Sequence, residues 1–391
     1  MTSIPPTSSH ATVPQRIYWI DYLRAINILG TVVFHSFLAY SPFVQKLDFS
    51  LLTAFPFVDR RAPLPISDLI LLVRPIFSMQ LMFFISGLFA WRGLVKRGPI
   101  HYLKLRAQRL LVPLVFVTVS LMPLTYLPSH LIGENPAPRL HLAQLWFLWV
   151  LFSFNILFVL AFIFFRNQIE FFIRSLNNIQ VYLLFILGVL ISYLPLAIVA
   201  GDSGWVPLVG PFILPRSRLG LYIVYFFAGI IMGSRCLASS VQASNFFSPF
   251  SAPLLPVKTT TLIALSSLIF YIISRLSVSY LINFFGVFYA WILVNASYAI
   301  SGLALVAALL LFSKKYLSKK RALHDNLSSN SYCIYLIHYL VVVWIQYILY
   351  YSPVDILVKP VLVVLVSIVF SCFLADLIRR LPLFKPYLLA E

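Results

Sequence analysis

Runs of about twenty apolar residues recur along the whole chain, and each is long enough for an α-helix to cross the hydrocarbon core of a bilayer. Prolines and polar clusters separate most of these runs. The pattern predicts an all-α, polytopic integral membrane protein with about ten transmembrane helices. The expected spans are 20–42, 66–91, 105–125, 143–165, 179–200, 216–235, 259–280, 290–312, 329–350 and 359–378.

The segments outside these spans suggest a simple domain organisation. Residues 1–15 are polar and contain prolines, which is typical of a flexible tail. Residues 16–380 are expected to form a single transmembrane domain, followed by a second short tail at 381–391. We see no repeat between the two halves, which argues against transporters that are built from repeats.

Composition and charge narrow the class of protein. Hydrophobic residues make up 61% of the chain and charged residues only 10%, a balance that soluble globular domains do not have. The net charge of +18 does not predict a nucleic-acid partner, because the basic residues lie between apolar spans. Of the 29 Lys and Arg residues, 19 fall in segments on one side of the bilayer, which predicts that both termini are cytoplasmic. We expect the bacterial inner membrane as the location.

Three cysteines, Cys236, Cys333 and Cys372, lie in or beside predicted spans. Their spacing does not match that of metal ligands. We therefore expect neither disulfides nor a metal cofactor.

The first predicted span carries a polar face formed by Asp21, Arg24, Asn27 and His35. A charge at the bilayer centre costs roughly 2.5–3.5 kcal/mol, so such side chains need a partner or a function. With about 100° of rotation per residue, Arg24 and His35 lie within about 20° of each other around the helix axis. Two interpretations remain open. One is an Asp21–Arg24 ion pair plus a histidine bonded inside a bundle, and the other is a buried site along this face.

The second predicted span carries Arg74 at the depth of His35. In the predicted orientation His35 lies about 10 Å from the outer end of its helix, and Arg74 lies about 12 Å from the outer surface. The two side chains meet if their helices are neighbours. Asp68 lies on a different face from Arg74 and is not its partner within the helix. Arg74 is therefore either a functional residue or one member of a structural ion pair.

A basic segment, 91–113, precedes the third predicted span and contains Arg92, Arg97, Arg106 and Arg109 without one acid. Arg106 and Arg109 are three residues apart and share a helix face. Such basicity is typical of anchoring on the cytoplasmic side or of contact with lipid headgroups. The alternative is a phosphate-binding site, because two guanidinium groups on one face can bind a pyrophosphate.

Aromatic residues and a second histidine mark two later spans. Trp146 and Trp149 near the outer interface are typical of a membrane-interface belt, although they are also suited to stacking on a sugar ring. His338 falls near mid-membrane, within a stripe of tyrosines at 332, 335 and 339. It is either a hydrogen-bonded packing residue or a second residue of the site.

Several of these stretches together resemble the acyltransferase 3 family of multi-spanning membrane acyltransferases. The similar stretches are IDYLRAINILGTVVFH, LMFFISGLFAWRG with KLRAQRLLVP, LWFLWVLF, and SYCIYLIHYLVVVW. The resemblance covers nearly all of 16–380. The opening RIYWIDYLRA is most similar to the branch that contains glucan biosynthesis protein C, which succinylates glucans.

The resemblance implies transfer of an acyl group, acetyl or succinyl, from cytoplasmic acyl-CoA to a hydroxyl of an extracytoplasmic carbohydrate or glycolipid. By position, His35, Arg24, Arg106 and Arg109 match residues of the family motifs. Some family members carry a further extracytoplasmic hydrolase-like domain of the SGNH type. We expect none here, because the last predicted span ends at 378 and the chain ends at Glu391. Transfer is then completed by the membrane domain or by a separate partner.

These residues predict a mechanism. His35 takes a proton from the acceptor hydroxyl, and Arg74 stabilises the developing oxyanion. Direct transfer and an acyl-histidine intermediate both fit. The expected ligands of CoA are Arg24, Arg92, Arg97, Arg106 and Arg109. Further candidates for the site are Asp21, Trp146 and His338. The competing prediction is a transporter or flippase of an anionic lipid or glycolipid, and a third is a structural subunit that only recruits partners.

Overall fold

Long helices make up most of the computed structural model, which describes residues 17–46, 55–133, 142–201, 205–207, 212–238, 255–382 and 387. The predicted tail at 1–15 and most of the predicted tail at 381–391 lie outside the described residues. The helices are α1 (Tyr18–Leu38), α2 (Pro42–Gln45), α4 (Pro65–Val73), η1 (Arg74–Ile76), α5 (Ser78–Arg97), α6 (Pro99–Ser120), α7 (Met122–Leu131), η2 (Ala143–Leu145), α8 (Trp146–Ser175), α9 (Asn178–Ala200), α10 (Leu219–Ala238), α12 (Val257–Leu276), α13 (Val278–Phe285), α14 (Val287–Tyr316), α15 (Ala322–Tyr350) and α16 (Val358–Arg380).

Eight helical segments in the described part of the chain are long and apolar enough to cross a membrane. They coincide with eight of the ten predicted spans, so the prediction of an all-α polytopic membrane protein is confirmed. The total of ten and the cytoplasmic position of both termini stay predictions. The eight segments are Pro65–Arg97, Pro99–Leu131, Ala143–Ser175, Asn178–Ala200, Val257–Leu276, Val287–Tyr316, His324–Tyr350 and Val358–Arg380.

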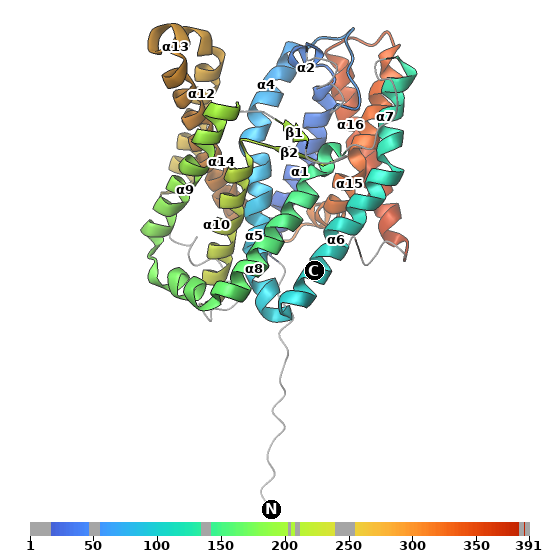
Figure 1. Ribbon diagram of the computed structural model, residues 1–391. Helices are drawn as coiled ribbons and strands as arrows, with labels where there is room; N and C mark the ends of the chain where they lie inside the picture. The colour runs from blue at the N-terminus through green and yellow to red at the C-terminus, as the bar shows by residue number, and fades with distance from the viewer. Residues whose placement is uncertain are drawn as a thin grey trace, which may run out of the picture.

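The other two predicted spans correspond to α1 and α10, which are helical where expected. In α10 the apolar stretch Leu219–Arg235 is shorter than the eight spans. In α1 the polar face lowers the apolar character of the helix. α1 packs against α4, α5, α14, α15 and α16, and its polar residues Asn27, Thr31 and His35 are buried among these helices. Figure 1 shows α1 and α4 near the centre, with α15 and α16 on one side and α10, α12 and α14 on the other.

The second predicted span, 66–91, is not one continuous helix. α4 ends at Val73, the short 3₁₀ turn η1 follows, and α5 begins at Ser78. Pro75 explains the break, because proline lacks the N–H that would continue the helical hydrogen bonds. Its carbonyl accepts hydrogen bonds from the side chains of Gln80 (3.1 Å) and Tyr298 (2.9 Å) instead. Arg74 therefore lies at a bend rather than along a regular helix face.

Two helix contacts hold the region around α1 and α5 together. Gln346 of α15 donates from Nε2 to the carbonyls of His35 (3.1 Å) and Ser36 (3.2 Å) in α1. α5 and α10 approach at backbone distance, since a Cβ atom at Gly87 or Gly229 would collide with a carbonyl of the facing helix. Small residues that allow such close approach are a common basis of helix packing in membranes.

A short β-hairpin, absent from the sequence prediction, lies between α9 and α10. Strands β1 (Trp205–Pro207) and β2 (Ile213–Pro215) pair antiparallel, with Val206 opposite Leu214. In Figure 1 the hairpin lies in front of α1 and α4. It positions Ile213 and the turn before α10 beside the cavity described next.

Candidate active site

A cavity of about 920 Å³ lies among α1, α4, η2, α10, α12 and α15. His35 and Arg74 both line it, so the two side chains meet in one space, as their predicted depths require. Three arginines and one carboxylate line this cavity, namely Arg74, Arg218, Arg275 and Asp68. The carboxylate Oδ1 of Asp68 accepts hydrogen bonds from Ser41 Oγ (2.5 Å) and from the backbone N–H of Phe43 (3.3 Å).

His35 forms a hydrogen bond through its Nδ1 to Nε2 of His338, at 2.9 Å. The Nδ1 atom of His338 lies 2.8 Å from the carbonyl of Tyr335 and 3.1 Å from that of Ile334. Two carbonyl oxygens accept only, so this Nδ1 must carry the proton and the Nε2 of His338 must be the acceptor. It follows that His35 donates from Nδ1 and keeps a lone pair on its own Nε2.

This contact identifies His338 as the group that orients His35. Asp21 cannot do so, because it lies fourteen residues before His35 on α1, which is about 21 Å of helix rise. His338 is fully buried, and the ring of Tyr339 stacks on His35 with centroids 4.2 Å apart. The imidazole of His35 is therefore fixed in both orientation and tautomer.

Arg74 lies across α1 instead of pairing with an acid. Its Nη1 donates to Asn27 Oδ1 at 2.8 Å, and its Nη2 donates to the carbonyl of Asn27 and to Thr31 Oγ1 (3.3 Å). Nδ2 of Asn27 donates to the carbonyl of Ser78 (3.0 Å), which fixes the orientation of the amide. Gly30 provides the room, because a Cβ atom there would lie 2.9 Å from Cζ of Arg74. The Nε of Arg74 is buried without a hydrogen-bond partner.

A charged pair, Asp21 and Arg24, lies at the other end of α1. Arg24 lies 3.3 Å from the carboxylate of Asp21, which is the i,i+3 ion pair that the spacing predicts. Neither residue lines the cavity.

The basic segment extends from the end of α5 across a turn into α6. Gly98, with a φ of +75°, makes this turn, and Pro99 then begins α6. The guanidinium of Arg106 lies over the ring of Tyr102 at 5.2 Å, and the charges of Arg97 and Arg106 act on Arg109. We call Arg97, Arg106 and Arg109 the inner arginine cluster.

The inner arginine cluster is separate from the cavity. Neither its three members nor the exposed Arg92 line it. The connection runs along α15, where the hydroxyl of Tyr332 donates to the carbonyl of Arg109 at 2.5 Å. The tyrosines of α15 therefore run from Tyr332, beside Arg109, to Tyr339, which stacks on His35.

Trp146 is not a membrane-belt residue. It is 8% exposed, lines the cavity and stacks on Tyr222 with ring centroids 5.6 Å apart. Trp149, one turn later, packs edge-on against Phe212 at 5.7 Å. The expectation of an interface belt is thus wrong for Trp146, because its side chain is buried in contact with Tyr222 of α10.

The chain also matches the model of a known protein family. The model of the acyltransferase domain of the acyltransferase 3 family matches residues 17–380, which is nearly the whole chain. The chain belongs to the acyltransferase 3 family. Membership indicates acyl transfer within the membrane. No curated protein and no solved structure matched the chain.

Three residues of this acyltransferase cavity escaped sequence reasoning as site residues. Gln144 stands beside the tryptophan motif and lines the cavity, although nothing in its spacing marks it. Arg275 lies in α12 and lines the cavity, although its place within an apolar run does not mark it as a site residue. Arg218 also lines the cavity, whereas Arg216, two residues earlier, is exposed and donates to the carbonyl of Ala200 (2.8 Å).

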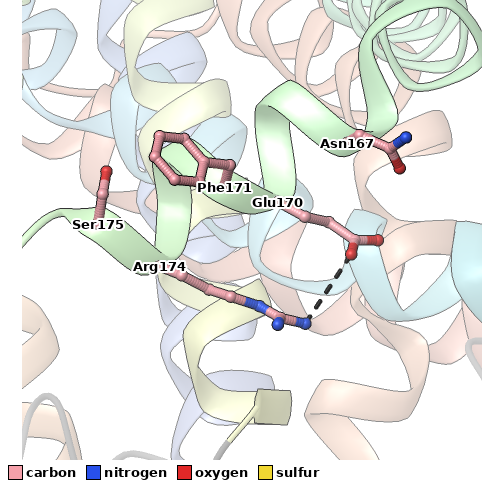
Figure 2. Close-up of a pocket in the computed structure, with 5 residues that line it drawn as sticks. All are labelled: Asn167, Glu170, Phe171, Arg174 and Ser175. Atoms are coloured by element: carbon pink, nitrogen blue, oxygen red, sulfur yellow. Dashed lines mark ion pairs between the residues drawn. The ribbon is translucent and has the colours of Figure 1, made fainter.

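A second pocket, of about 420 Å³, lies far from these residues along the chain. Figure 2 shows its lining, which comes entirely from the C-terminal part of α8, with Arg174 reaching toward Glu170. Their closest atoms are 3.9 Å apart, and Arg166 lies 3.0 Å from the same carboxylate group. Within the described ranges, no three His, Cys, Asp or Glu side chains gather where they could hold a metal ion.

Proposed function

We propose that this membrane acyltransferase moves an acetyl or succinyl group from cytoplasmic acyl-CoA to a hydroxyl of an extracytoplasmic carbohydrate or glycolipid. The hydrogen bond between His35 and His338 carries the proposal. It leaves the Nε2 lone pair of His35 available to a hydroxyl group in the cavity. An imidazole held in one tautomer is suited to general-base catalysis.

In the proposed transfer, His35 acts first as a base and then as an acid. The acceptor hydroxyl gives its proton to Nε2 of His35, and its oxygen bonds to the thioester carbonyl carbon. The carbon–sulfur bond then breaks, and the leaving thiolate takes the proton from His35 to become CoA-SH. Arg74 stabilises the negative charge on the carbonyl oxygen, because its guanidinium lines the same cavity and has a buried N–H without a partner.

The inner arginine cluster is suited to the phosphates of CoA. Guanidinium groups bind phosphate oxygens in pairs. Tyr332, beside Arg109, and Tyr339, on His35, are seven residues apart on α15. This spacing is about 10 Å of helix rise, whereas an extended pantetheine arm reaches about 15–20 Å. The arm is therefore long enough to span the distance along α15 between the level of the cluster and the level of His35.

A thiol-release assay on purified protein in detergent tests the proposal. Acetyl-CoA and succinyl-CoA are offered separately, with and without an extract of cell-envelope glycans. We expect acceptor-dependent release with one of the donors, reduced by about 10²–10⁴-fold in His35→Ala. His130→Ala is the matched control, because this histidine is exposed and does not line the cavity. Full activity of His35→Ala would overturn the assigned base.

The same preparation separates the proposal from its main competitor. A transporter or flippase moves its substrate without consuming acyl-CoA. Absence of thiol release together with absence of CoA binding would therefore favour the transporter. Release with succinyl-CoA in preference to acetyl-CoA would support the likeness to the glucan-succinylating branch.

A further inference from the structure

Gln144 is a buried amide that no protein group satisfies. Its side chain is 6% exposed and lines the cavity beside Trp146. Both its Oε1 and its Nε2 are buried and have no hydrogen-bond partner. A buried amide without partners is costly, and nearly all such groups in proteins are satisfied. A group that enters the cavity can supply the hydrogen bonds that the protein does not give to this amide.

The backbone around Gln144 is held firmly while its side chain is not. The hydroxyl of Tyr335 donates to the carbonyl of Gln144 at 2.6 Å, and the N–H of Leu145 donates to the carbonyl of Leu142 at 2.7 Å. Ala143 has a φ of +41°, in the left-handed region that residues other than glycine rarely adopt. Strain of this kind persists where the surrounding structure enforces it, and it clusters at functional sites.

The surroundings of Gln144 indicate the chemistry of the ligand. Trp146 and Tyr222 form a stacked aromatic wall, and Tyr335 and Tyr339 line the same cavity. A sugar ring presents apolar C–H faces to such rings and presents hydroxyl groups at its edge. A carboxamide both donates and accepts hydrogen bonds, so it matches two neighbouring hydroxyls, each of which does the same.

We propose that Gln144 binds the acceptor carbohydrate and sets its specificity. Nε2 donates to one hydroxyl oxygen, and Oε1 accepts from the neighbouring hydroxyl, which positions the sugar near His35. This inference rests on the proposed function for its acceptor. Beyond that function, the inference assigns to Gln144 the selection and the orientation of the acceptor sugar.

Steady-state kinetics of Gln144→Leu test the proposal. The Michaelis constant for the glycan acceptor should rise about tenfold or more, because two hydrogen bonds to the substrate are lost. The Michaelis constant for acyl-CoA should change less than twofold. A rise in the acyl-CoA constant alone would overturn the proposal and assign Gln144 to the acyl group.

Thermal unfolding distinguishes binding from a structural role. Since the amide of Gln144 has no partner in the protein, Gln144→Leu should not lower the unfolding temperature. Asn295→Leu is the matched control. The amide of Asn295 is equally buried, but it donates to the carbonyl of Trp291 (2.8 Å) and accepts from Tyr193 (3.1 Å), so its loss should lower that temperature. A drop for Gln144→Leu equal to that of the control, with both Michaelis constants unchanged, would overturn the proposal.

A binding assay separates failure of this inference from failure of the proposed function. The probe is a neutral linear glucan oligosaccharide, and its binding is followed by the quenching of tryptophan fluorescence. Binding that Gln144→Leu abolishes supports this inference even if no acyl transfer is found. Transfer by the wild-type protein with an unchanged acceptor constant in Gln144→Leu overturns this inference alone. Absence of both transfer and binding overturns both.

Discussion

The cavity around His35 and the inner arginine cluster are built in opposite ways. In the cavity the decisive contacts join residues far apart in the sequence, such as His35 with His338, 303 residues away. The cluster comes from one helical hairpin, between Arg97 and Arg109. The cavity is thus a product of tertiary packing, and the cluster is a product of local sequence. Substitutions in the cavity should act through geometry, whereas those in the cluster should act through charge.

Removing the partner of His35 should have the largest effect. His338→Leu cannot accept the hydrogen bond from Nδ1 of His35, so the tautomer is no longer fixed and kcat should fall about 10²–10³-fold. His338→Gln can present an oxygen near the former Nε2 position and should recover most of the rate. The measurement is kcat for thiol release in the two variants. Equal losses in both would show that His338 serves packing rather than the orientation of His35.

Displacing Arg74 without altering its charge should have the next largest effect. In Gly30→Ala the new methyl group takes the place of the guanidinium, so kcat should fall about tenfold, or about 1.4 kcal/mol. The unfolding temperature should change little, because the end of a flexible side chain can move. Gly188→Ala, another substitution within a helix, meets only Val224 at 3.3 Å and is the control. An unchanged kcat in Gly30→Ala would mean that the position of Arg74 does not matter to transfer.

Neutralising the inner arginine cluster should affect donor binding and spare the rate. Each of Arg106→Gln and Arg109→Gln should raise the Michaelis constant for acyl-CoA about tenfold, since a hydrogen bond to a charged group is worth about 1.5 kcal/mol at the lower end of its range. Arg216→Gln, an exposed arginine outside the cluster, is the control. The prediction is contradicted if kcat falls while the Michaelis constant stays the same.

Added salt should have the smallest effect of the four changes. It should also distinguish the inner arginine cluster from the cavity around His35 most clearly. Raising NaCl from about 50 to 500 mM shortens the screening length to about 4 Å, so the Michaelis constant for acyl-CoA should rise about twofold to fivefold. The buried His35 and His338 are shielded from the solution, and kcat should stay constant. A parallel change in both kinetic constants would remove the distinction between the two regions.

The sequence was informative where the membrane imposes a rule. A run of apolar residues predicts a span because the bilayer demands one, and the polar face of α1 predicts a buried site for the same reason. Helix rise alone predicted that Arg74 and His35 could meet, and both line one cavity. The ion pair of Asp21 with Arg24 followed from spacing on one helix face.

The sequence was silent where a contact depends on packing between distant segments. His338 was a candidate, but its hydrogen bond to His35 requires α1 and α15 to be neighbours, which no local pattern specifies. Pro75 indicates the bend in the sequence, but the long apolar run around it favoured the prediction of one continuous helix over 66–91. Gln144 became notable only when its amide proved to have no partner, which is a property of the folded protein.

The distance along the chain between His35 and His338 also has a consequence for biosynthesis. At about 5–20 residues per second, a ribosome needs roughly 15–60 s to extend the chain from the first histidine to the second. During that interval α1 is present with His35, but the helix that completes the site has not been made. Gln346, which donates hydrogen bonds to the carbonyls of His35 and Ser36 in α1, follows eight residues after His338. The contact between His35 and His338 can therefore form only after α15 has been translated and inserted beside α1.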